Sequence, residues 1–474
     1  MTAVRPGTGQ VSHPTPALAA RLASLVDGAN GAAGVRLASV TAPVEAVDPI
    51  SLYAAAVEAD LEAALWLRPS EGTAFVGVGR AWATEPEGPD RFAEAERAWR
   101  ELLRTGRIDG ASPILMGGLG FTGRRPAETD AWAPFGPASL VLPELLYAST
   151  GDGATLTASV VAATDDQDRR WTALQRRARE IEPSPNGMVA RPVFAPLTVI
   201  DEQPGREAWD RLVGMFAGAV GRGRIDKVVL ARRVGLRSPV ELDVPNALRR
   251  LAASAPESTT YAFRRGGRTF LGSTPERLAR TEGRSFRTMA VAGSIRRGAD
   301  AAEDAALAAE LLASEKDREE QAIVVDSIRA QLAPIAETLE VAPEPSVMTL
   351  RFVQHLATEI SGTLPEARGL LSLAGLLHPT PAVGGQPRDV ALALVEEHEG
   401  FDRGWYAGPI GWLGADDDGE LCVALRCGIV DHTTATLFAG CGIVADSDAA
   451  AEWEESRMKL RAVVSALGIP ADER

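Results

Sequence analysis

Two stretches of the sequence place pairs of carboxylates three residues apart beside apolar positions. SEKDREEQAIVVDSI contains Asp317 and Glu320, and AAAEWEESRMKL contains Glu452 and Glu455. Residues at this spacing share one face of a helix, so in helices each pair would border a buried stripe. A carboxylate there needs a compensating charge, and a hard cation such as Mg²⁺ prefers carboxylate oxygens as ligands. One acid from each helix would therefore suit a magnesium site.

The spacing leaves a second interpretation open for both stretches. Runs of Glu and Lys on a helix usually face solvent. Glu455 and Lys459 lie at positions i and i+4, and a surface pair of this kind contributes only about 0.3 kcal/mol. A solvated helix face and a metal site are therefore alternatives at this point.

Two basic residues lie within apolar runs. KVVLARRV places Lys227 on one strand face with Val229 and Ala231, where a lysine can act as a base or can lie on an edge strand. We predict ELCVALRCGIV to be one strand with Arg426 among small residues of one face. A buried arginine needs an anionic partner, and its planar fork suits a carboxylate. That carboxylate can belong to a ligand or to a distant acid of the chain.

Three further places carry weaker signals. Gly440 and Gly442 interrupt the strand-like run TLFAGCGIV, as glycines do at a bulge or where a ligand approaches the backbone. Glu276 in GSTPERLAR and the pair Gly293 and Ser294 in TMAVAGSIRRG are compatible with ordinary surface turns. By themselves they assign no chemistry.

The elements that must position these residues alternate irregularly between helix and strand, which predicts an α+β fold. Helices are predicted at 51–66, at 90–105, and in DVPNALRRLAASA, AAEDAALAAELLASEKDREEQAIVVDSIRAQL and AAAEWEESRMKLRAVVSAL. Strands are predicted in TAFVGVG, PASLVLPELLYA, KVVLARRV, TYAFRRGGRTFLGS, ELCVALRCGIV and TATLFAGCGIV. Residues 1–15 are expected to form a flexible tail, and the Pro-rich stretch 182–197 a connector.

The composition argues against several classes of protein. The chain has 474 residues, of which 45% are hydrophobic, so it can bury a large core. No apolar run reaches the roughly 18 residues that a membrane span needs, and the first residues contain no hydrophobic signal region. Three cysteines without CxxC spacing predict no disulfide framework, which favours the cytoplasm. The net charge of −15 argues against nucleic-acid binding, so an anionic substrate would need local cations.

Ten blocks of this sequence occur in the order seen in a known family. They are KVVLARR, LGSTPERL, VAGSIRRG, SEKDREEQ, QHLATEISG, LLHPTPAVGGQP, FDRGWYAGPIGW, LRCGIV, FAGCGIV and EWEESRMK. With them, residues 198–474 resemble the catalytic region of the chorismate-utilising enzymes, which include isochorismate, salicylate, anthranilate and aminodeoxychorismate synthases. The resemblance implies two stacked, largely antiparallel sheets flanked by helices, with the site in a cleft between them. Residues 16–197 would be the variable N-terminal part of one integrated unit.

The resemblance also assigns roles to the candidate residues. Glu320 and Glu455 would bind Mg²⁺, and Asp317 and Glu452 would support them through water. The implied substrate-binding residues are Gly293, Ser294, His355, Ala382, Tyr406, Arg426, Gly440 and Lys459.

Two carboxylates of chorismate would be bound within this set. Arg426, the backbone at Gly440 and Lys459 would hold the enolpyruvyl carboxylate. The metal and the amides of Gly293 and Ser294 would hold the ring carboxylate.

Lys227 and Glu276 match the catalytic pair of the isochorismate synthases. Lys227 would activate a water molecule for addition at ring C2, and Glu276 would protonate the hydroxyl that leaves C4. Anthranilate synthases usually have Gln at the position of Lys227, and aminodeoxychorismate synthases usually have Lys at that of Ala292. The resemblance therefore implies a Mg²⁺-dependent isochorismate synthase, an isomerase, with chorismate as its small-molecule partner and a monomeric state. Its product would serve menaquinone, catechol siderophore or salicylate-derived pathways.

Salicylate synthase, which also eliminates pyruvate, is the alternative. Such enzymes usually have Thr at the position of Ala382, whereas the HPTPA form resembles isochorismate synthases. Gln321 stands where His is usual, and Gly384 stands where Ser is frequent, so pyruvate elimination stays open. A non-catalytic chorismate-binding protein is the remote alternative, and it would be expected to have lost an acid, base or ligand position. Every such position is filled here.

Overall fold

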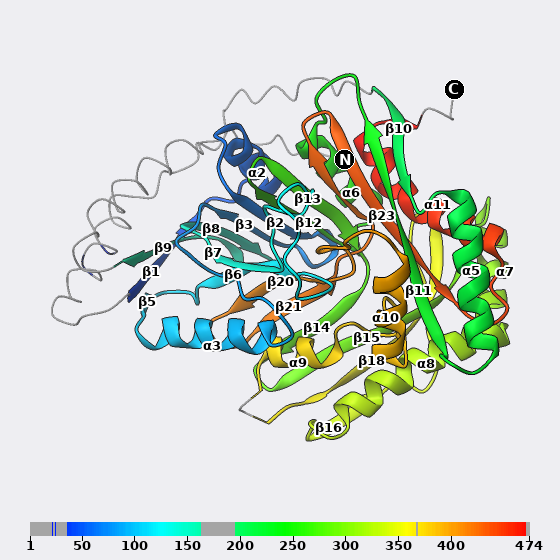
Figure 1. Cartoon of the computed structure of the whole chain (residues 1–474). Coiled ribbons are helices and arrows are strands. Elements are labelled where there is room, and N and C mark those ends of the chain that lie inside the picture. The colour runs from blue at the N-terminus through cyan, green and yellow to red at the C-terminus, as the bar shows by residue number, and fades with distance from the viewer. Residues whose placement is uncertain (1–20, 22–23, 25–35, 163–194, 366–367, 471–474) are drawn as a thin grey trace.

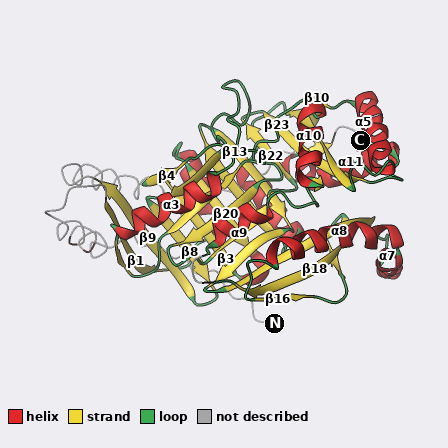
Figure 2. Cartoon of the chain, turned by 60° about the horizontal axis from the view of Figure 1, so that its bottom comes forward, coloured by secondary structure: helices red, strands yellow, loops and turns green. Residues whose placement is uncertain are grey.

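Two largely antiparallel β-sheets flanked by helices form an α+β fold, as the sequence predicts (Figures 1 and 2). The structure is a computed structural model, and it describes residues 21, 24, 36–162, 195–365 and 368–470. The predicted tail at 1–15 and nearly all of the connector at 182–197 lie outside the described residues.

The larger sheet has 14 strands, and β19 adjoins β11 outside the main strand order. In order across the sheet, its strands are β24 (Ile469–Pro470), β10 (Pro196–Gln203), β11 (Lys227–Arg237), β23 (Thr434–Ile443), β22 (Cys427–Asp431), β13 (Arg268–Thr274), β12 (Thr259–Arg265), β2 (Ala63–Arg68), β3 (Thr73–Val78), β8 (Leu145–Thr150), β9 (Gly153–Ala162), β1 (Arg36–Val44) and β5 (Arg107–Asp109), with β19 (Gly385–Gln386) beside β11.

The smaller sheet has ten strands, and it too combines early and late parts of the chain. In order, its strands are β16 (Thr338–Val341), β18 (Val353–Thr363), β15 (Ser285–Arg296), β14 (Arg277–Glu282), β21 (Gly419–Val423), β20 (Pro409–Gly414), β6 (Ile114–Leu119), β7 (Ala138–Leu142) and β4 (Trp82–Thr84), with β17 (Ser346–Thr349) beside β18. One hydrophobic cluster contains apolar side chains of both sheets, so the sheets share a core.

The helices pack on these sheets. They are α2 (Pro49–Glu58), α3 (Arg91–Arg104), α5 (Arg206–Gly221), α6 (Val244–Ser254), α7 (Ala301–Ala313), α8 (Glu315–Leu332), α9 (Leu370–Leu377), α10 (Arg388–His398), α11 (Ala449–Leu467) and the short 3-10 helix η1 (Pro69–Glu71). α8 lies against β15 and β18 of the smaller sheet, and Figure 2 shows it alongside β18, whereas α11 packs on β23 of the larger sheet. The two acidic helices therefore belong to different sheets.

Most of the predicted elements are present. TAFVGVG forms β3, PASLVLPELLYA forms β7 and β8, KVVLARRV lies in β11, TYAFRRGGRTFLGS forms β12 and β13, and TATLFAGCGIV forms β23. DVPNALRRLAASA contains α6, the long acidic stretch forms α7 and α8 with a break at Ser314, and the last predicted helix is α11.

The predicted helix at 51–66 is wrong in its second half. α2 ends at Glu58, and the buried run that follows is the strand β2. Asp60 has a φ of 53°, a left-handed conformation that a helix does not continue through. A short apolar run such as AALW does not by itself distinguish a strand from a buried helix.

The prediction of one strand in ELCVALRCGIV is also wrong. β21 ends at Val423 in the smaller sheet, and β22 begins at Cys427 in the larger sheet. Between them, Arg426 has a φ of 48°, so the chain turns from one sheet to the other. The run is apolar on both faces, because both strands are buried, and no alternation marks the turn.

The remaining expectations concern cysteines and membrane spans. Cys422, Cys427 and Cys441 are buried and free. Among the helices of the described residues, none combines the length and the apolar character that crossing a membrane requires.

Candidate active site

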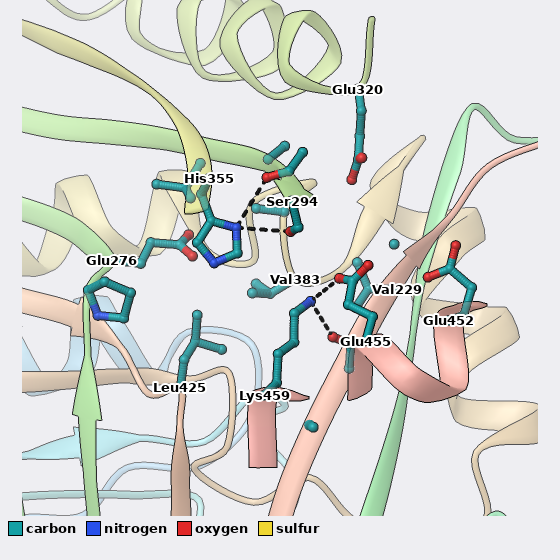
Figure 3. Close-up of a pocket in the computed structure, with 18 of the residues that line it drawn as sticks. Val229, Glu276, Ser294, Glu320, His355, Val383, Leu425, Glu452, Glu455 and Lys459 are labelled. Carbon is teal, nitrogen blue, oxygen red and sulfur yellow. Dashed lines mark hydrogen bonds and ion pairs between the residues drawn. The ribbon is translucent and has the colours of Figure 1, made fainter. Parts of the chain in front are cut away.

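One pocket contains every candidate residue named from the sequence, and Figure 3 shows many of them. Its cavity of about 220 Å³ suits one small-molecule ligand. Its walls come from β11 and β23 of the larger sheet, β15 and β18 of the smaller sheet, and the helices α8 and α11. The candidates that line it are Lys227, Glu276, Gly293, Ser294, Asp317, Glu320, His355, Ala382, Tyr406, Arg426, Gly440, Glu452, Glu455 and Lys459.

The acidic residues lie at the N-terminal ends of α8 and α11. Ser314 caps α8, where its hydroxyl oxygen accepts a hydrogen bond from the Asp317 amide at 3.2 Å. Asp448 caps α11 by accepting hydrogen bonds from two first-turn amides. Helix N-termini carry partial positive charge that stabilises nearby carboxylates. Of the four candidate acids, Asp317 and Glu452 lie in the first turns, where this effect acts.

Lys227 is buried and bonded to an acid of α8. Its side chain is 2% exposed, and its ammonium nitrogen lies 2.7 Å from Glu320 Oε1. Lys227 is therefore not a solvent-exposed edge lysine. A Cβ at Gly442 on the neighbouring strand would lie 2.6 Å from Lys227 Cε and 2.9 Å from Glu320 Oε1. The ion pair thus occupies space that only a glycine at this position leaves free.

Glu455 and Lys459 form the ion pair that their spacing allows, but they form it in the pocket (Figure 3). Lys459 Nζ lies 2.6 Å from Glu455 Oε1 and donates to the Gly440 carbonyl at 2.9 Å. Burial favours a neutral Glu455, but the charge and hydrogen bond of Lys459 together with the charges of Arg426 and Lys227 outweigh it and hold the pKa of Glu455 below its usual value. Burial also disfavours charge on Lys459, but the charge and hydrogen bond of Glu455 together with Cys441 outweigh it and raise the pKa of Lys459.

Glu452 lies close to Glu455, and the two carboxylates repel each other. Burial and the charge of Glu455 raise the pKa of Glu452 to about 7. Ligand atoms of these two acids and of Cys441 lie within 4.8 Å of one another. Burial and Glu455 raise the pKa of the Cys441 thiol well above its usual value, so the sulfur is a poor ligand for a hard cation. The crowded carboxylates fit a divalent cation, which would relieve their repulsion.

Arg426 faces the pocket without a carboxylate partner among the described residues. Its guanidinium donates to His355 Nε2 at 3.0 Å. His355 therefore carries its proton on Nδ1, which lies 3.1 Å from the Gly293 carbonyl oxygen and 2.9 Å from Ser294 Oγ. Burial and the nearby cations lower the pKa of His355 to about 3, so the ring is neutral. The sequence left open an ion pair between Arg426 and a distant acid. Among the described residues, no such acid contacts Arg426.

Glu276 lies apart from the α8 and α11 acids, on the other side of the pocket (Figure 3). It is 4% exposed. Burial raises its pKa to about 7, against the opposing effect of Arg426, Lys227 and Lys459. A carboxyl group with this pKa is substantially protonated near neutral pH and can donate a proton.

Glycines allow close approaches in the pocket walls. A Cβ at Gly440 would lie 2.8 Å from the hydroxyl of Tyr406, whose ring stacks on Phe438 at 5.4 Å. Gly293 has a φ of 74° at a bulge of β15, and a Cβ there would lie 3.0 Å from Asp317 Cβ. The interruptions seen in the sequence therefore mark close approaches of side chains to the backbone.

Several lining residues were not predicted. They are Val229, Pro275, Val291, Ala292, Lys316, Val383, Leu425, Phe438 and Ala439. Strand alternation could have found some of them, because Phe438 lies two residues from Gly440, and Val229 lies two from Lys227. Val383 and Leu425 lie outside regular strands, where no period applies.

Gln321, which departs from the family pattern, does not line the pocket. It is buried, and its amide nitrogen donates to the Ala290 carbonyl at 3.0 Å and to Thr358 Oγ1 at 2.9 Å. It therefore fastens the first turns of α8 to β15 and β18.

Comparisons with known proteins found similar sequences and a similar structure. A family model described as "Chorismate binding enzyme" matches residues 25–468. The chain is 36% identical over 437 residues to the salicylate biosynthesis isochorismate synthase of Pseudomonas aeruginosa, covering 91% of this chain and 90% of that protein. It is 31% identical over 447 residues to isochorismate synthase MenF of Bacillus subtilis, covering 91% and 93%. The structure of MenF, the menaquinone-specific isochorismate synthase from Escherichia coli, matches with a TM-score of 0.77 at 27% identity, covering 94% of this chain and 99% of that one.

Proposed function

This chain belongs to the family of chorismate-binding enzymes, and from that premise we propose that it is an isochorismate synthase, an isomerase. The reaction would convert chorismate reversibly into isochorismate. The oxygen of a water molecule bonds to ring C2, the ring double bonds shift, and the C4 hydroxyl leaves as water. Relatives named isochorismate synthases that align over about nine-tenths of the chain support this proposal.

The observation that carries the proposal is the pair of cations in a pocket of an otherwise acidic protein. Arg426 has no carboxylate in contact among the described residues, and Lys459, which donates to the Gly440 carbonyl, lines the same pocket. Chorismate has two carboxylates, and charge-assisted hydrogen bonds to them are strong where water is excluded. Arg426 and Lys459 would hold one carboxylate, and the amides of Gly293 and Ser294 would face the other.

Lys227 and Glu276 would carry out the two proton transfers. Lys227 would accept a proton from the water that attacks C2, and Glu276 would donate one to the hydroxyl that leaves C4. The raised pKa of Glu276, about 7, supports its role as the acid. The burial of Lys227 supports its role as a base in a site shielded from bulk water.

The carboxylates of Glu320 and Glu455 would bind Mg²⁺, with Asp317 and Glu452 beside them. The crowding of Glu452 and Glu455 and the raised pKa of Glu452, about 7, support a cation beside the α11 acids, and Glu320 lines the same pocket. When bound, Mg²⁺ would supply positive charge for the ring carboxylate. The lysines that now pair with Glu320 and Glu455 would have to release those oxygens.

Product analysis tests the proposal. The purified chain is incubated with chorismate and Mg²⁺ in the absence of ammonia, and the products are separated by chromatography. We expect isochorismate alone, approaching equilibrium with chorismate. Salicylate and pyruvate formed at an enzyme-dependent rate would identify a salicylate synthase instead, and would remove the argument from Ala382. No turnover with tight chorismate binding would identify a non-catalytic binder.

A further inference from the structure

The strand that carries Lys227 has a gap along one of its edges. β11 pairs with β23 along its inner edge. On its outer edge, β19 pairs with Lys227 and Val228, and β10 pairs with residues from Arg233 onward. No described strand pairs with residues 229–232 on this edge, although the Val229 amide donates to the Gly384 carbonyl at 3.1 Å, in the loop just before β19. A buried backbone group left without a hydrogen-bond partner there would be costly.

A buried ion pair fills much of this gap with side-chain atoms. Glu399 Oε1 accepts a hydrogen bond from the Ala231 amide at 2.7 Å. Arg403 donates through Nη2 to the Val229 carbonyl at 2.8 Å, and through Nε to Glu399 Oε2 at 2.7 Å. Glu399 and Arg403 are each 3% exposed. The pair therefore bonds the Ala231 amide and the Val229 carbonyl, and the Gly384 carbonyl accepts from the Val229 amide, where a neighbouring strand would otherwise make these bonds.

The same arginine reaches a second wall of the pocket. Arg403 Nη1 donates to the Val383 carbonyl at 2.8 Å, and Val383 follows Ala382 in the loop before β19. Val229, Ala382 and Val383 all line the pocket, whereas neither member of the ion pair does. One guanidinium thus joins the strand behind Lys227 to the loop that faces it.

A charged pair can satisfy backbone groups at this place that apolar residues could not. A buried ion pair loses so much hydration that apolar residues of similar size are often equally stabilising. Apolar residues, however, could not satisfy the amide of Ala231 and the carbonyls of Val229 and Val383. A planar guanidinium can donate in several fixed directions at once, which a lysine cannot.

We propose that Glu399 and Arg403 are positioning residues, which act in place of a missing strand and hold Lys227 on β11 in fixed relation to the Ala382–Val383 loop. The proposal rests on the proposed function for its catalytic consequence. The bridging role itself rests on the hydrogen bonds alone. Neither residue touches the pocket, so the effect on catalysis is through the geometry of Lys227.

The variant Arg403→Lys tests the proposal most directly, because it keeps the charge opposite Glu399 but cannot bond both carbonyls. We expect kcat to fall about 10- to 100-fold, as misplacement of a catalytic group by about 1 Å does. The KM for chorismate should change less than kcat does, because Arg426 and Lys459, the proposed substrate cations, belong to other elements. The matched control is Arg68→Lys, an arginine of β2 with a side chain 12% exposed that pairs with Glu420 and does not line the pocket. Its kcat should stay within about twofold.

Hydrogen exchange supplies a readout that is independent of activity. Arg403→Lys should speed exchange of the amides around Ala231, because the Ala231 amide donates to Glu399, and Arg68→Lys should leave those amides protected. If Arg403→Lys does not yield folded protein, Glu399→Gln, which keeps an acceptor for Ala231, should show the same changes at smaller size.

Two outcomes would overturn the proposal. One is unchanged exchange at these amides in a folded Arg403→Lys variant. The other is an equal loss of kcat in both arginine variants, which would reflect a general loss of stability. If the wild-type chain made no isochorismate while the exchange differed as expected, the proposed function would fail and the bridging role would stand.

Discussion

At the scale of single residues, Lys227 and Lys459 hold the carboxylate oxygens that a metal would require. Lys227 lies 2.7 Å from Glu320 Oε1, and Lys459 lies 2.6 Å from Glu455 Oε1. A lysine ammonium and a Mg²⁺ ion that approach the same carboxylate would repel each other strongly where water is scarce. Each lysine therefore competes with Mg²⁺ for its acid, besides any role that it has toward the substrate.

Lys227→Met separates these two effects. Turnover should fall about 100- to 10,000-fold, the usual cost of removing a general base. Mg²⁺ should bind several-fold more tightly in a calorimetric titration, because a positive charge beside Glu320 is gone. The control is Lys316→Met, which removes a charge that lines the same pocket but has a side chain 48% exposed. Near-normal turnover would remove Lys227 from its role as the base, and unchanged Mg²⁺ affinity would refute the competition.

The pKa of Glu276, raised to about 7 mainly by burial, predicts the alkaline limb of the pH profile. The acid must be protonated to donate to the leaving hydroxyl. The value of kcat/KM should therefore be highest below about pH 7 and fall about tenfold per pH unit above it. Initial rates with limiting chorismate at a series of pH values measure this limb. A profile that stays flat up to pH 9 would assign the acid to another group.

The same raised pKa makes a prediction about stability. Folded Glu276 holds its proton up to about pH 7, whereas the unfolded chain loses it near 4.5. The contribution of Glu276 to the free energy of unfolding is therefore fully present below pH 4.5. It is lost as the pH rises through 7, and the total loss is about 3 kcal/mol. Glu276→Gln cannot titrate. The difference in unfolding free energy between wild type and this variant, measured by denaturant titration, should shift in favour of the variant across that pH window.

At the scale of elements, the sequence was most informative where all residues of a spacing pattern belong to one helix or strand. The spacing of Glu452 and Glu455 predicted that both acids face one side of α11, and both line the pocket. The bridge between Glu399 and Ala231 could not be predicted in this way, because the two residues are 168 positions apart. Such a contact depends on the order of strands, which local periodicity does not contain.

The strand β23 provides a test of element packing. A methyl group at Gly442 would lie 2.6 Å from Lys227 Cε and 2.9 Å from Glu320 Oε1, so Gly442→Ala must displace one of these side chains. We expect kcat to fall at least about tenfold, while the far-ultraviolet circular dichroism is unchanged. Gly214→Ala is the control, since its added Cβ would meet nothing within 4 Å in α5 and alanine favours a helix. Equal activity of the two variants would show that the space beside Lys227 is not critical.

At the scale of the whole molecule, the pocket depends on a sheet order that mixes distant parts of the chain. β2 pairs with β12, and β6 pairs with β20, so segments before residue 120 support strands whose neighbours carry the site. The α+β class was predictable from irregular alternation. The transfer of the chain between sheets at Arg426 was not, because both flanking strands are buried and equally apolar.

Ligand binding should therefore stabilise the chain as one unit. The pocket joins both sheets, so a ligand that contacts its walls binds only the fully assembled fold. At a ligand concentration of 100 times Kd, the added stability is about 2.7 kcal/mol. A thermal unfolding scan with Mg²⁺ and chorismate should show the transition of the free protein moved upward by a few degrees without splitting.

Two variants show which ligand causes which part of the upward shift in the unfolding temperature. Arg426→Gln removes the guanidinium that has no carboxylate partner in the described chain, so it should abolish the shift caused by chorismate and retain that caused by Mg²⁺. Glu455→Gln should weaken the shift caused by Mg²⁺, because it replaces a proposed ligand, and should lower the dependence of turnover on Mg²⁺. If chorismate moved only one of two separable transitions, the sheets would unfold independently. The pocket would then belong to one of them, contrary to the strand order of the fold.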